Sequence, residues 1–90
     1  MQPRENIMST AGYPKIFEGV RGILGRFAKT STPIEEETEL VNDLGLDSLM
    51  VMEIVEEVED TFDISFPLNN LSKIRTVRDF ALQIQQELGA

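Results

Sequence analysis

Apolar residues recur at helical spacing in three stretches of this 90-residue chain. They predict one helix from Pro14 to Lys29, a second from Asp47 to about Thr61, and a third that follows Thr76 and runs to Leu88. In each stretch the spacing of three, four or seven residues places the apolar side chains on one helix face. These faces are formed by Ile16, Val20, Ile23, Leu24 and Phe27, by Val51, Ile54, Val55, Val58 and Phe62, and by Val77, Phe80, Ala81, Ile84 and Leu88.

The segments between these helices differ in character. Leu68 to Lys73 predicts one short helical turn with Leu71 and Ile74 facing inward, whereas residues 30–47 form a long connection that Pro33 keeps from being helical. We expect its apolar side chains to hold it against the core: Ile34, Leu40, Val41, Leu44 and Leu46. The sequence therefore predicts an all-α fold, a small bundle of three main helices plus one short helix.

The ends of the second and third helices carry clear local signals. Asp47 is a good N-cap, and Gly45 just before it allows a tight turn. Thr76 is followed three residues later by Asp79, which is typical of a capping arrangement, and Gly89 suits the end of the last helix.

Residues 1–12 have mixed polarity and no periodic pattern, so we expect a disordered N-terminal tail ahead of one folded domain at 13–90. The tail resembles neither a signal peptide nor a transit peptide. No stretch approaches the roughly 20 apolar residues of a membrane span. The sequence predicts a cytoplasmic, monomeric protein without a membrane span.

Acidic charge is concentrated in the middle of the chain. Eight basic against sixteen acidic residues give a net charge of −8, and residues 35–63 hold twelve carboxylates and no basic residue. Such a chain is repelled by nucleic-acid phosphates and anionic lipid, so we expect no nucleic-acid partner. The charge instead favours basic protein patches as partners.

The chemistry available for catalysis or metal binding is narrow. Cysteine and histidine are absent, which excludes thiolate nucleophiles, disulfides and both serine–histidine and cysteine–histidine catalysis. A calcium loop starting at Asp43 fails on spacing, because its sixth position is Ser48 instead of glycine and its twelfth is Ile54 instead of glutamate. We therefore expect neither an enzyme nor a metal site.

Ser48 occupies the first turn of the second predicted helix, directly after its cap. Free backbone N–H groups and the helix dipole favour a phosphate-linked group at such a place. By position alone, an ordinary first-turn serine is the more common case.

The outer face of the same helix is unusually acidic. Glu53 with Glu57, and Glu56 with Asp60, are like-charge pairs four residues apart, each costing a few tenths of a kcal/mol. No lysine relieves this repulsion, so a recognition surface explains the pattern better than stability does. Leu49 and Met52 also fall among the acids, where they are typical either of scattered surface residues or of apolar anchors for a partner.

The segment from Asp43 to Leu49, Asp-Leu-Gly-Leu-Asp-Ser-Leu, together with the acidic helix that follows, resembles the acyl carrier proteins. The resemblance continues through Phe62-Asp63-Ile64 and Phe66-Pro67 to the segment Lys73–Asp79, and covers roughly residues 14–88. It implies that Ser48 carries a covalent 4'-phosphopantetheine arm, transferred from coenzyme A by a phosphopantetheinyl transferase, and that the arm's thiol carries acyl groups as thioesters.

The resemblance also implies roles for the neighbouring residues. Asp47 is expected to contact the transferase and its metal, and the acidic helix to dock on arginine and lysine patches of acyl-transferring and condensing enzymes. The expected docking residues are Leu49, Met52, Glu53, Glu56, Glu59 and Asp60. An apolar lining near Val51, Ile54, Val55, Phe66 and Ile74 is expected to shelter part of the acyl chain.

Two other interpretations stay open from the sequence: a peptidyl or aminoacyl carrier, and an unmodified acidic adaptor, which would be indifferent to the loss of Ser48. Within the resemblance, Met50 replaces a common acid and Glu56 a common apolar residue, and the first helix holds three glycines. These differences favour a specialised lipid or polyketide pathway at least as much as general fatty-acid synthesis.

Overall fold

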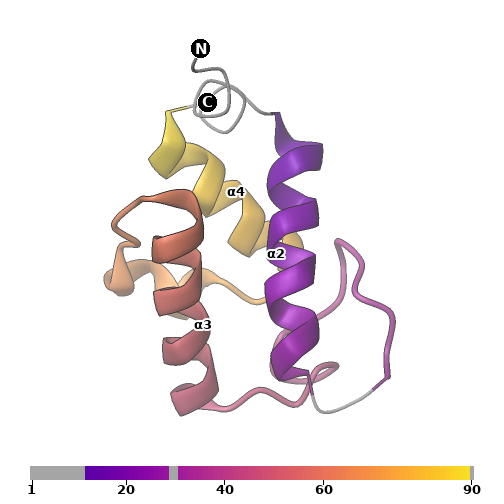
Figure 1. Ribbon diagram of the computed structural model, residues 1–90. Helices are drawn as coiled ribbons and strands as arrows, with labels where there is room; N and C mark the ends of the chain where they lie inside the picture. The colour runs from indigo at the N-terminus through magenta and orange to yellow at the C-terminus, as the bar shows by residue number, and fades with distance from the viewer. Residues whose placement is uncertain (1–11, 29–30, 90) are drawn as a thin grey trace.

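The computed structural model describes residues 12–28 and 31–89. They form three α-helices, α2 (Tyr13–Phe27), α3 (Ser48–Phe62) and α4 (Val77–Leu88), and one 3-10 helix, η1 (Leu68–Lys73), with no strand among the described residues. The predicted all-α bundle of three main helices plus one short helix is confirmed (Figure 1). The predicted tail at residues 1–12 lies, except for Gly12, outside the described residues.

The helix ends follow the local sequence signals in most places. The Asp47 carboxylate accepts a hydrogen bond from the backbone N–H of Met50 at 2.9 Å, so Asp47 is the N-cap of α3 as predicted. Gly89 ends α4 in the left-handed conformation, with φ of 76°. The predicted extension of α2 to Lys29 is wrong, because Ala28 is already extended and α2 ends at Phe27.

One buried apolar core joins all the main helices. α2 contacts both α3 and α4, and in Figure 1 it runs beside α3 while α4 crosses at an angle. The most deeply buried large side chains come from all three α-helices and from the connection between α2 and α3. They are Ile16, Val20, Leu24, Leu44, Ile54, Val58, Val77, Phe80 and Ile84.

The connection between α2 and α3 is held against the core by three leucine side chains. Leu40, Leu44 and Leu46 are buried, as predicted. Val41 is 63% exposed, so its expected place in the core is wrong. The chain turns here with hydrogen bonds to residues four to six positions back, which sends residues 40 and 44 to one side and Val41 to the other.

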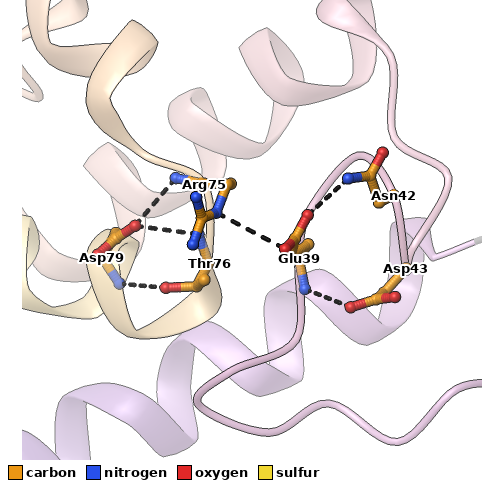
Figure 2. A network of polar contacts seen from close by, with 6 residues as sticks. All are labelled: Glu39, Asn42, Asp43, Arg75, Thr76 and Asp79. Atoms are coloured by element: carbon orange, nitrogen blue, oxygen red, sulfur yellow. Dashed lines mark hydrogen bonds and ion pairs between the residues drawn. The ribbon is translucent and has the colours of Figure 1, made fainter.

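The same connection is hydrogen-bonded to the segment just before α4. An isolated antiparallel bridge joins Glu39 to Thr76, and the backbone N–H of Leu40 donates to the carbonyl of Arg75 at 3.0 Å. Glu39 also forms an ion pair with Arg75, with Nε and Oε2 3.6 Å apart (Figure 2). These contacts attach the segment that precedes Ser48 to the body of the bundle.

Asp79 and Thr76 complete this network with the predicted capping box. The hydroxyl of Thr76 accepts from the backbone N–H of Asp79, and the Asp79 carboxylate accepts from the backbone N–H groups of Thr76 and Arg75. Burial raises the pKa of the Asp79 carboxyl, but the hydrogen bonds from Arg75 and Thr76 outweigh burial and hold that pKa below its ordinary value.

Candidate functional site

Ser48 is the first residue of α3 and its side chain is exposed. Two features of the preceding chain place it there: Gly45 adopts a positive φ of 71°, and Leu46 is buried, with its N–H donating to the carbonyl of Leu40. The buried Leu46 and the Asp47 cap therefore fix where α3 begins. In Figure 1 this first turn of α3 lies at the end of the bundle opposite the first turn of α2.

An open groove of about 270 Å³ lies directly beside Ser48. One side is formed by α3 and its cap, and the other by the preceding connection and by η1. The groove is lined by Val41, Asp47, Ser48, Val51, Met52, Leu71 and Ser72. Sequence patterns did not reveal Val41, Leu71 and Ser72 as part of this site, because the residues facing Ser48 come from segments without strong periodicity.

A second, more enclosed cavity of about 110 Å³ extends into the core. It shares Val41, Val51 and Leu71 with the groove, so the two hollows adjoin at these three side chains. The remaining lining is apolar or aromatic: Leu24, Leu40, Leu46, Ile54, Ile74 and Phe80. Of the residues expected to shelter an acyl chain, Val51, Ile54 and Ile74 line this cavity, while Val55 and Phe66 are buried elsewhere in the core.

The outer face of α3 divides into a centre and two flanks. Leu49, Glu53, Glu56 and Asp60 recur at intervals of four, three and four residues and are exposed, which places them along one line of the helix. Leu49 is 69% exposed. The three carboxylates form no ion pair with any residue in the described part of the chain. We call these four residues the acidic stripe.

Both flanks of the acidic stripe are occupied by contacts within the fold. On the side toward α2, Glu57 forms an ion pair with Arg26, with Oε1 and Nη2 3.1 Å apart. On the other side, the Glu59 carboxylate accepts a hydrogen bond from the backbone N–H of Phe66 at 2.8 Å. Met52, 41% exposed, lies on this second side and lines the groove. Of the six predicted docking residues, four therefore form the stripe and two, Met52 and Glu59, lie at its edge.

Among residues 12–28 and 31–89, no cluster of three or more acidic side chains is arranged to hold a metal ion. Within the same ranges, each helix is too short or too polar to cross a membrane.

Comparison with known proteins identifies the class. Residues 18–89 match the family described as phosphopantetheine attachment site. The chain is 32% identical over 80 residues to an acyl carrier protein of Thermotoga maritima, a match that covers 88% of this chain and 99% of that protein. It is 41% identical over 59 residues to a probable acyl carrier protein of Caulobacter vibrioides, covering 66% of this chain and 64% of the relative.

A third similarity is to one part of a much larger protein. Over 77 residues, 84% of this chain, the identity is 36% to a segment that makes up 3% of the non-reducing polyketide synthase pigA of Monascus ruber. The all-helical fold and these matches define a protein that bears a phosphopantetheine arm. The chain belongs to the phosphopantetheine attachment family, as an acyl carrier protein. It is a carrier with covalent 4'-phosphopantetheine, and not itself a catalyst, which confirms the resemblance seen in the sequence.

Proposed function

We propose that Ser48 is the residue to which the 4'-phosphopantetheine arm is attached. The observation that carries this proposal is the exposure of Ser48 at the N-terminus of α3, at the mouth of the groove. Backbone N–H groups of the first turn and the helix dipole favour the negative charge of a phosphodiester there. The Ser48 hydroxyl has no histidine in the chain to activate it, so a separate transferase has to supply the base and coenzyme A the arm.

The groove fits the arm that this attachment would bring. Val41, Val51 and Leu71 offer apolar surface, and the hydroxyl of Ser72 offers a hydrogen-bonding group on the side opposite Ser48. A phosphopantetheine arm alternates amide groups with apolar carbon, so its chemistry matches this mixed lining. Asp47, which also lines the groove, is the residue proposed to contact the transferase and its metal.

The inner cavity is the proposed shelter for the acyl chain. It adjoins the groove at Val41, Val51 and Leu71, so only apolar side chains lie between the groove and this part of the core. Its volume of about 110 Å³ is smaller than the roughly 150 Å³ of an engineered apolar cavity that binds benzene. Scaled from the six carbons of benzene, the cavity without expansion accommodates about four acyl carbons.

The acidic stripe is the proposed docking surface for partner enzymes. Its carboxylates attract a basic surface from a distance and fix how that surface aligns along α3. Leu49 supplies an apolar contact close to Ser48. The proposed partners are a phosphopantetheinyl transferase and acyl-transferring and condensing enzymes of fatty-acid or specialised lipid and polyketide synthesis. The proposed setting is a monomer in the cytoplasm, with residues 13–90 as the carrier domain.

Intact-mass measurement after incubation with coenzyme A and a broad-specificity phosphopantetheinyl transferase tests the attachment site. The parent chain is expected to gain one phosphopantetheine and Ser48→Ala none. Ser72→Ala is the matched control, because Ser72 lines the same groove, and it is expected to be modified like the parent. The assignment to Ser48 would be overturned if folded Ser48→Ala gained the arm, or if Ser72→Ala were the only variant that failed to gain it.

A further inference from the structure

We infer that Arg26 limits the docking surface of α3 to the acidic stripe, and so acts as a specificity residue for basic partners. This inference rests on the proposed docking function of the stripe. Arg26 lies in the last turn of α2, and its guanidinium is 3.1 Å from the Glu57 carboxylate at the flank of the stripe. Within the described part of the chain, this is the one ion pair that joins α2 to α3.

The pair changes the electric field at the edge of the acidic face. Glu57 is one of five acids on the outer side of α3, and without a partner it would widen the negative surface toward α2. Arg26 cancels that charge locally. A basic partner shifted toward α2 would meet this neutral ion pair in place of another free carboxylate.

The energetics of the pair indicate recognition more than stability. Both side chains are largely exposed, 61% for Arg26 and 44% for Glu57. An exposed ion pair adds little to folding, because water screens it and two long side chains lose freedom. Like charges brought together at an interface, however, disfavour a wrong partner or a wrong register.

Arg21 provides a control with the same change in net charge. It lies on the same helix, and it forms an ion pair with Glu18, three residues earlier, with Nη1 and Oε2 3.8 Å apart. At 100° per residue it lies about 140° around the helix from Arg26, on the flank away from α3. Comparing the two variants therefore separates a local effect of Arg26 on docking from the general effect of lowering the net charge of the protein by one unit.

The experiment measures KM for the unmodified protein with a broad-specificity phosphopantetheinyl transferase. Arg26→Gln is expected to lower KM by about two- to fivefold, and Arg21→Gln by less than about 1.5-fold. Arg26→Lys, which keeps the charge, is expected to restore the parent KM. The double variant Arg26→Gln/Glu57→Gln should also return near the parent value, because the local charge is again zero.

Salt and stability measurements distinguish electrostatics from a structural effect. The difference between Arg26→Gln and Arg21→Gln should disappear at about 0.5 M salt, where the Debye length is roughly 4 Å. Thermal unfolding of each variant confirms that all are folded. Equal KM values for Arg26→Gln and Arg21→Gln, or a difference that persists at high salt, would overturn the inference.

A separate variant keeps the inference distinct from the proposed function. Glu53→Gln removes a carboxylate from the stripe itself and is expected to raise KM. If Glu53→Gln has no effect, the stripe is not the docking surface and the proposed docking fails. If Glu53→Gln raises KM while Arg26→Gln matches Arg21→Gln, docking stands and only the role of Arg26 is wrong.

Discussion

Gly19 of α2 lies directly against the ring of Phe62 at the end of α3. A Cβ atom at Gly19 would fall 2.8 Å from Cζ of Phe62, closer than side chains pack. Phe62 is buried, so its ring has little room to move. This glycine therefore sets how closely the two helices approach, and with it the position of α3 relative to Arg26.

The first prediction compares two glycines of the same helix. Gly19→Ala is expected to lower the free energy of unfolding by about 0.5–2 kcal/mol, because overpacking outweighs the gain in helix propensity. Gly22→Ala is expected to raise it by about 0.5–1 kcal/mol, because a Cβ at Gly22 meets nothing within 4 Å. Denaturant unfolding of both variants checks this, and equal stabilisation by the two substitutions would contradict the close approach at Phe62.

The second prediction separates two roles of Asp47. Asp47→Ala removes the side-chain cap on the Met50 N–H and is expected to cost about 1 kcal/mol of stability. Asp47→Ser keeps a capping oxygen and should change stability by only a few tenths of a kcal/mol. If Asp47 also helps to hold the transferase metal, Asp47→Ser slows phosphopantetheine transfer by about ten- to a hundredfold. Transfer to Asp47→Ser at the parent rate would reduce the role of Asp47 to capping.

The third prediction concerns stability at low pH. The pKa of Asp79 is lowered from its ordinary 3.8, so the folded state binds this proton more weakly than the unfolded state. The stabilisation that depends on ionised Asp79 is present above pH 3.8 and is lost as the pH falls through the lowered value. Asp79→Asn is expected to be less stable than the parent at pH 7 and to lose less stability between pH 5 and pH 2. Unfolding curves at several pH values check this, and parallel losses in both proteins would contradict it.

The fourth prediction tests the inner cavity. Ile54→Phe fills part of the space next to Val51 and Ile74. Cleavage of the acyl thioester by hydroxylamine is compared for acyl chains of increasing length. In Ile54→Phe, the longest chain whose thioester is still protected is expected to be shorter than in the parent protein. Leu68→Phe is the control, since Leu68 is half exposed on η1 and does not line the cavity. Identical protection of every chain length in Ile54→Phe and the control would mean that the chain does not enter there.

Local chemistry explains why much of the site was predictable from the sequence. The cap by Asp47, the capping box of Thr76 and Asp79, and the end at Gly89 depend on residues within four positions of one another. The exposure of Ser48 and Leu49 follows from the cap and from the helical period of α3. These features require no knowledge of how distant segments pack.

Contacts between distant segments were beyond such reasoning. Val41 directly follows the buried Leu40, yet the turn of the chain directs it to the groove beside Ser48. Glu57 and Glu59 look equivalent to Glu53 and Glu56 in the acidic run. Only the position of α2 pairs Glu57 with Arg26, and only the chain after α3 brings the Phe66 N–H to Glu59.

The amino-acid sequence by itself determined the helices, their caps, the acidic character of α3 and the place of Ser48 at its start. These properties arise from periodicity, propensity and hydrogen bonds over a few residues. The tertiary structure alone decided the groove, the inner cavity and the width of the acidic stripe. Each of them depends on the distance between segments far apart in the chain, which is set by packing contacts such as that of Gly19 with Phe62.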